Sequence, residues 1–229
     1  MDGDQPEPRP LRYLRDPDEI YRLSFATVRR EARLDHLPED VAELAIRLIH
    51  ATGRIETADR LAWSADCARA GAAALAAGAP ILCDCEMVAS GVTRRLLPAE
   101  NPVLVTLNHA ETPGRARAEG TTRSAAAVAL WRPRLAGAVV AIGNAPTALF
   151  RLLEGLDEGW PRPAAILGFP GGFVGAAESK AELAARPRGV PYVTLRGRSG
   201  GSALAAAAVN ALAIRARANL RTPADVSPS

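Results

Sequence analysis

The sequence has 229 residues, of which 48% are hydrophobic and 23% charged, and its mean hydropathy is near zero. This composition excludes a wholly disordered chain and predicts one compact domain over residues 11–220, with flexible ends at 1–10 and 221–229. The net charge of +3 does not favour a nucleic-acid-binding protein. The longest apolar run, 203–214, is too short to cross a membrane, and residues 1–10 lack the apolar core of a secretory signal, so we expect a cytoplasmic protein.

Periodic apolar residues predict two N-terminal helices, over 16–32 and 38–53, and a third over 64–78. Asp16 followed by Pro17 is a typical helix start, and Gly53 is a typical helix end. Short apolar runs then alternate with helical segments. The predicted strands are 80–83, 103–107, 138–142, 164–168 and 192–195, and the predicted helices are 86–91, 122–131, 146–156, 176–186 and 202–217. This alternation predicts an α/β fold, a three-layer α/β/α sandwich around a mainly parallel five-stranded sheet, extended by the N-terminal helices.

The loops after the five predicted strands are rich in Gly, Pro, Asn and charged residues. In an open parallel sheet such loops meet at one edge, where ligands bind. The last loop, 196–202, holds two arginines and three glycines and leads into a helix, which suits an anion bound by backbone N–H groups. Because neither a Walker loop nor a dinucleotide-binding glycine motif is present, nucleotide binding is disfavoured, and a carboxylate fits as well as a phosphate. Arg123 is either a second carboxylate contact or a solvated arginine.

Histidines and cysteines are the remaining candidates for chemistry. His50 falls in the last turn of its predicted helix, away from the apolar stripe, where the helix dipole favours the imidazolium. It is therefore either a proton donor, with Arg47 one turn earlier holding an anionic substrate, or a surface histidine that caps carbonyl groups. Cys83 and Cys85 predict buried thiols at a strand end rather than a zinc site, because the second pair of ligands is missing.

Seven short segments, taken in chain order, form a pattern that none of them carries alone. They are 50–53 (His-Ala-Thr-Gly), 78–84 with 86–88, 91–94, 122–124, 144–150, 176–180 (Ala-Ala-Glu-Ser-Lys), and 196–198 with 200–202. Together they resemble the precorrin-8X methylmutase family of cobalamin biosynthesis, and the likeness runs from about Tyr13 to Leu212. Two positions depart from the family pattern. Gly171 stands where valine is expected, and Thr121 where asparagine is expected.

The resemblance implies a flavodoxin-like homodimer with its active site near the subunit interface and with no cofactor or metal. It implies an isomerase that moves a methyl group from carbon 11 to carbon 12 of precorrin-8X, a tetrapyrrole, to give hydrogenobyrinate, with His50 as general acid. It also implies a set of substrate-binding residues, which are Ser24, Arg47, Arg123, Asn144, Thr147, Lys180, Arg198, Gly200 and Gly201. Two alternatives stay open: a cobalt-bearing ring as substrate, and a non-catalytic carrier of the same pigment.

Overall fold

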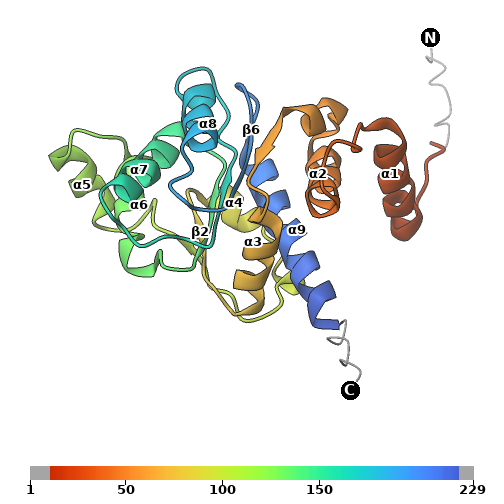
Figure 1. Ribbon diagram of the computed structural model, residues 1–229, viewed down its shortest axis with the longest axis horizontal. Coiled ribbons are helices and arrows are strands. Elements are labelled where there is room, and N and C mark those ends of the chain that lie inside the picture. The colour runs from red at the N-terminus through yellow and green to blue at the C-terminus, as the bar shows by residue number, and fades with distance from the viewer. Residues whose placement is uncertain (1–10, 222–229) are drawn as a thin grey trace, which may run out of the picture.

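A computed structural model describes residues 11–221 of the chain (Figure 1). The two predicted N-terminal helices are confirmed as α1 (Pro17–Glu31) and α2 (Glu39–Thr52). The Asp16 carboxylate accepts hydrogen bonds from the backbone N–H groups of Asp18 and Glu19, which caps α1. Gly53 ends α2 with a φ of 65°, a left-handed conformation that suits glycine. Of the predicted flexible ends, 1–10 and 222–229 lie outside the described residues, whereas Arg221 is the last residue of α9.

The remaining elements follow the predicted alternation closely. The helices are α3 (Cys67–Ala76), α4 (Glu86–Gly91), α5 (Thr112–Ala118), α6 (Arg123–Ala129), α7 (Pro146–Asp157), α8 (Ala176–Ala185) and α9 (Ser202–Arg221), with short 3-10 turns η1 (Ile55–Arg60), η2 (Arg94–Leu96) and η3 (Arg132–Arg134). The strands are β1 (Leu61–Trp63), β2 (Ile81–Cys83), β3 (Val103–Val105), β4 (Val139–Ile142), β5 (Ala165–Gly168) and β6 (Tyr192–Leu195). Within residues 11–221, no helix is long and apolar enough to cross a membrane.

The sheet has six strands in the order β1-β6-β5-β4-β2-β3, so the prediction of five strands is wrong. The five predicted strands are all parallel, and their order is that of flavodoxin-like sheets. The strand that sequence reasoning missed, β1, pairs antiparallel with β6 along one edge, with Leu61 opposite Leu195. Its three residues directly follow the η1 turn and are too few to show a strand period.

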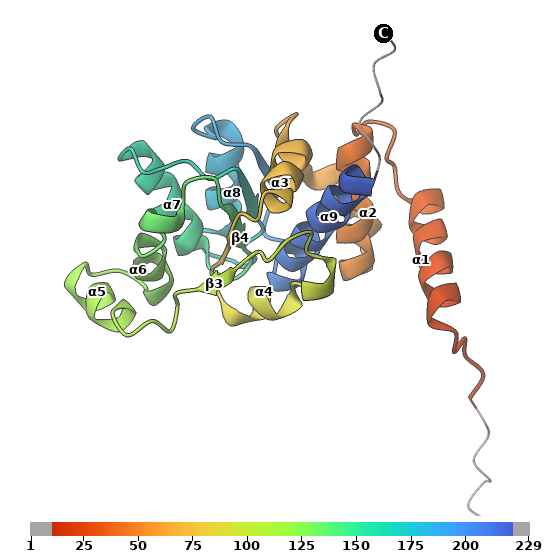
Figure 2. The ribbon, with the colours of Figure 1, turned by 90° about the horizontal axis from the view of Figure 1, so that it is seen from below.

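Side chains alternate between the two faces of the sheet and build a core on each. Ile81, Val139 and Leu167 pack on the face covered by α2, α3, α4 and α9. Leu82, Val140 and Ile166 pack on the opposite face, with α6, α7 and α8. Figures 1 and 2 show these two groups of helices on either side of the sheet. The predicted three-layer sandwich is therefore confirmed.

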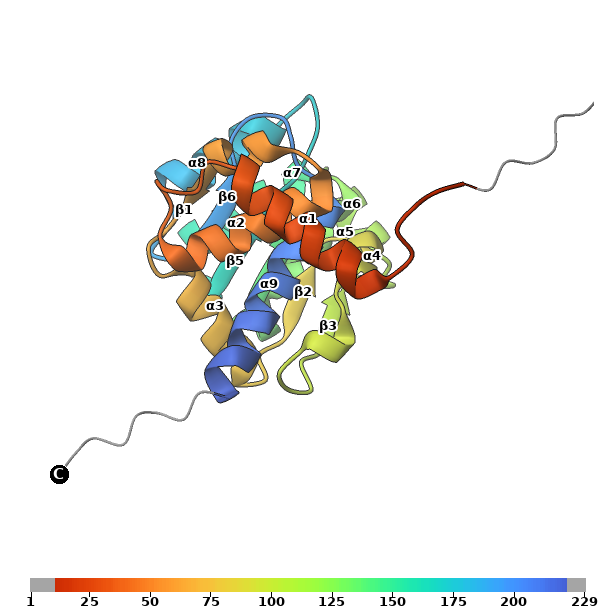
Figure 3. The same ribbon diagram turned by 90° about the vertical axis from the view of Figure 1, so that its right-hand side faces the viewer.

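Helix α1 stands outside this sandwich. Within residues 11–221, its extensive contacts with other helices and strands are those with α2. Figure 3 shows it lying across α2 on the outer side of the molecule. Two of its large apolar side chains are exposed, at 46% for Ile20 and 43% for Leu23. This isolated helix carries Ser24 and Phe25 toward the end of α2.

The carboxylate of Asp84 links the two central strands at the point where the strand order reverses. Asp84 follows β2, is 2% exposed, and accepts hydrogen bonds from the backbone N–H groups of three consecutive residues after β4. Those residues are Gly143, Asn144 and Ala145, at 3.0, 2.9 and 2.8 Å. Burial raises the pKa of Asp84, and the three N–H donors oppose that shift. The carboxylate thus fixes the loop that leads into α7.

We expect Asp84→Ala to lower the free energy of unfolding by about 2–5 kcal/mol, because three buried N–H groups lose their acceptor. Asp84→Asn keeps one acceptor oxygen and is expected to lose about half as much. Chemical denaturation followed by circular dichroism measures both. The exposed Asp35→Asn is the control and is expected to stay within ~0.5 kcal/mol of the unmodified chain. Equal stability of Asp84→Ala and the control would contradict the role assigned to Asp84.

Candidate functional site

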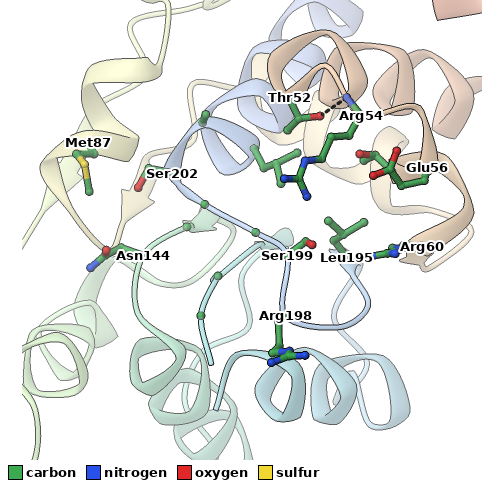
Figure 4. Close-up of a pocket in the computed structure, with 18 residues that line it drawn as sticks. Thr52, Arg54, Glu56, Arg60, Met87, Asn144, Leu195, Arg198, Ser199 and Ser202 are labelled. Carbon is green, nitrogen blue, oxygen red and sulfur yellow. Dashed lines mark hydrogen bonds between the residues drawn. The ribbon is translucent and has the colours of Figure 1, made fainter. Parts of the chain in front are cut away.

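A cleft of about 760 Å³ opens at the carboxyl ends of the parallel strands (Figure 4). Figure 4 shows Arg54, Glu56 and Arg60 on one wall and Met87 and Asn144 on the opposite one. The glycine-rich loop after β6 lies between the walls. The other residues that line the cleft are Thr52, Thr57, Gly143, Gly171, Gly172, Leu195, Arg198, Ser199, Gly200, Gly201, Ser202, Ala203 and Leu204. The cleft therefore lies where the order of the strands predicts a ligand site.

The lining of the cleft is rich in unpaired positive charge. Arg54, Arg60 and Arg198 take part in none of the ion pairs formed within residues 11–221. Glu56 is the one acidic side chain among the lining residues. Arginine forks bind carboxylates with two parallel hydrogen bonds, so this set suits a ligand that bears several carboxylates.

Close backbone contacts hold the glycine-rich loop against the end of β5. The Gly201 N–H donates to the Phe169 carbonyl at 2.7 Å, and the Gly172 N–H donates to the Arg198 carbonyl at 3.1 Å. A Cβ on Gly200 would lie only 2.4 Å from the Phe169 carbonyl oxygen. Glycine at position 200 is thus required by this approach of two backbones. Gly171, the departure from the family pattern, faces the backbone of Gly200, and a Cβ there would lie 3.0 Å from it.

A second group of side chains lies at the end of α2, beside the cleft rather than in its lining. The Ser24 hydroxyl and His50 Nδ1 are 2.8 Å apart. The His50 ring contacts both Phe25 and Tyr21, with centroid distances of 4.9 and 5.5 Å, and those two rings lie 4.5 Å from each other. Arg47 donates to the Tyr21 hydroxyl at 3.1 Å and lies over the Phe25 ring. The structure thus brings three predicted residues together and holds the exposed imidazole in one orientation.

The other predicted residues divide between the cleft and its surroundings. Asn144, Arg198, Gly200 and Gly201 line the cleft. Arg123 instead donates to the Asn108 side chain at 2.9 Å, and the Thr147 hydroxyl lies 2.8 Å from that of Thr122.

Lys180 lies inside the protein, at 1% exposure, and donates to the Ser199 carbonyl. Burial lowers the pKa of Lys180 to about 8. Lys180 therefore does not line the cleft, although its hydrogen-bond partner does.

Sequence reasoning missed the wall formed by Arg54, Glu56 and Arg60. Glu56 and Arg60 belong to the η1 turn, and Arg54 directly precedes it. This segment has no apolar periodicity, and only its position just after the His-Ala-Thr-Gly segment pointed to these residues. Cys83 and Cys85 are buried and free, as predicted, and burial raises the pKa of the Cys83 thiol. Within residues 11–221, no three His, Cys, Asp or Glu side chains cluster as metal ligands would.

The flavodoxin-like strand order and the arginine-lined cleft define an α/β protein whose cleft, at the switch point of its sheet, is suited to an anionic ligand. Residues 19–215 match the precorrin-8X methylmutase family. The chain therefore belongs to that family, and it is an isomerase of cobalamin biosynthesis.

Individual relatives agree with this assignment. The precorrin-8X methylmutase of Pseudomonas aeruginosa is 63% identical over 88% of this chain and 97% of its own length, and that of Sinorhizobium sp is 58% identical over 88% and 96%. The crystal structure of the Thermus thermophilus precorrin-8X methylmutase superposes with a TM-score of 0.80 at 38% identity, over 90% of this chain and all of that one. Relatives named cobalt-precorrin-8 methylmutase match at 30–36% identity.

We expect Gly200→Ala to lower the free energy of unfolding by roughly 2–4 kcal/mol, because the new methyl group meets backbone oxygens that cannot move aside independently. Gly114→Ala is the matched control. Gly114 lies inside the exposed helix α5 with nothing within 4 Å of an added Cβ, so alanine is expected to raise stability by about 0.5–1 kcal/mol. Thermal unfolding of both variants tests this. A Gly200→Ala variant as stable as the unmodified chain would show that the glycine-rich loop is not held close to the backbone after β5.

Proposed function

We propose that this chain catalyses the 1,5-methyl shift from carbon 11 to carbon 12 of metal-free precorrin-8X, giving hydrogenobyrinate, in the cytoplasm. The relatives named for the metal-free substrate are nearly twice as similar to it as those named for the cobalt-bearing one. The substrate carries acetate and propionate groups around a conjugated ring. The unpaired Arg54, Arg60 and Arg198 supply the charge that such a rim requires.

The observation that carries the proposal is the 2.8 Å contact between the Ser24 hydroxyl and His50 Nδ1. It occupies one ring nitrogen and leaves Nε2 without a hydrogen-bond partner among residues 11–221. A methyl shift within a conjugated ring needs no nucleophile, but protonation of the ring polarises its π system. His50 donates that proton, an effect worth roughly 10²–10⁴-fold in rate. Ser24 and the flanking aromatic rings hold the imidazole in place.

Arg47 supports the same reaction from the turn before His50. It is held by Tyr21 and stacked over Phe25, so its guanidinium is oriented before the substrate arrives. Arg123 has the same planar fork and is tied to Asn108 on a neighbouring loop. Both arginines contact carboxylates of the ring in this proposal.

The protein acts as a homodimer in this proposal, with α1 in the interface. Ile20 and Leu23 expose an apolar surface on a helix whose extensive contacts within residues 11–221 are with α2. Such a surface on a soluble helix is typical of a protein interface. Because Ser24 lies on the same helix, the interface forms next to His50.

Substitution of the proton donor tests the reaction. We expect His50→Ala to lower kcat for metal-free precorrin-8X by about 10²–10⁴-fold and to bind hydrogenobyrinate within a few-fold of the unmodified protein. His36→Ala, which removes another exposed histidine, is the control and is expected to retain full activity. Visible absorption follows conversion. Binding without conversion by the unmodified protein would indicate a carrier, and conversion of the cobalt-bearing ring alone would assign the other substrate.

Charge introduced on α1 tests the dimer. We expect the double variant Ile20→Arg/Leu23→Arg to sediment as a monomer while the unmodified protein sediments as a dimer, because two like charges per subunit are brought into the apolar interface. Leu220→Arg, at the far end of the described chain, is the control and is expected to leave the dimer intact. Analytical ultracentrifugation distinguishes the two, and a double variant that remains dimeric would move the interface away from α1.

A further inference from the structure

Lys180 combines three properties that a structural role alone does not explain. It is the only lysine in a sequence whose other basic residues are all arginines. Its side chain is 1% exposed, and it forms no ion pair within residues 11–221. Its hydrogen-bond acceptor is the backbone carbonyl of Ser199, in the middle of the loop that lines the cleft. Burying an ammonium without a counter-ion costs stability, so its presence here calls for another benefit.

The position of the Ser199 carbonyl explains that benefit. The neighbouring residues are already held by Phe169 and Gly172, through the Gly201 N–H and the Arg198 carbonyl. Lys180 holds the Ser199 carbonyl, which lies between these two contacts in the chain, from the side of α8. A carbonyl oxygen turned into the cleft would repel a carboxylate, whereas one bound to Lys180 is directed away from it. The ammonium also adds positive charge directly beneath the loop.

We propose that Lys180 is a positioning residue, which draws the Ser199 carbonyl inward so that the 198–202 loop presents Arg198 and backbone N–H groups to a carboxylate of the substrate. Lys180 itself does not touch the substrate. Its effect on the reaction is exerted on binding, because the loop lines the cleft whereas the His50 group does not. The inference rests on the proposed function only for the identity of the ligand.

Lys180→Met tests this, because methionine fills the same space without the charge. We expect KM for precorrin-8X and Kd for hydrogenobyrinate to rise by about tenfold or more, while kcat changes less than about threefold. Chemical denaturation at pH 7 is expected to give a stability equal to or above that of the unmodified protein, since the desolvated charge is gone. Arg151→Met removes a partly buried cation in the middle of α7, outside the cleft lining, and is the matched control, expected to leave KM unchanged.

A measurement on the unmodified protein keeps the proposal testable if Lys180→Met does not fold. Labelling with lysine that carries ¹⁵N at the side-chain nitrogen gives one signal, since the chain has one lysine. We expect addition of hydrogenobyrinate to shift that signal. Unchanged KM in a folded Lys180→Met, or an unshifted signal in protein saturated with hydrogenobyrinate, would overturn the proposal. Failure of the unmodified protein to bind or convert the ring would instead count against the proposed function.

Discussion

The cleft depends on one buried carboxylate. The sheet alone does not restrain the loop after β4. At this point the chain leaves β2 toward β3 and leaves β4 toward β5, and these strands lie toward opposite edges of the sheet. Asp84 supplies the restraint by accepting three N–H groups of that loop, and two of the donors, Gly143 and Asn144, line the cleft. The α7 helix then begins from a fixed position. A ligand site at a switch point needs a contact of this kind, because part of its lining follows β2 and part follows β4, and the chain leaves these two strands in different directions.

Charge is distributed so that the cleft remains ready for an anion. Several arginines elsewhere are neutralised by a nearby carboxylate, as in the pair of Arg151 with Glu158 and that of Arg188 with Asp157. Exposed pairs of this kind contribute little to stability, so their absence from the cleft is no loss to the fold. Arg54, Arg60 and Arg198 therefore keep their hydrogen-bond donors for a ligand.

Periodicity predicted the elements that bury a full face, and it failed where burial is partial or the element is short. The five parallel strands and α7 carry unbroken apolar patterns, and their predicted bounds differ from the observed ones by few residues. Strand β1 has three residues, and α5 contains Gly114 and two exposed arginines, so neither shows a period. The His50 group was predicted from the family resemblance and the helix end. Lys180 was predicted to bind the substrate, but its side chain is buried and does not line the cleft. Sequence cannot distinguish a residue that lines a cleft from one that lies beneath it.

The two parts of the proposed site are joined by a single short stretch of chain. Helix α2 ends at Thr52, which lines the cleft, and His50 lies two residues before that end. The left-handed Gly53 turns the chain directly into the wall that carries Arg54. A rigid helix thus fixes the proposed proton donor, and the next turn fixes, relative to it, the arginines proposed to bind carboxylates. In the proposed reaction the ring is large enough to meet both, so a small error in the turn at Gly53 would misplace the proton relative to the bound ring.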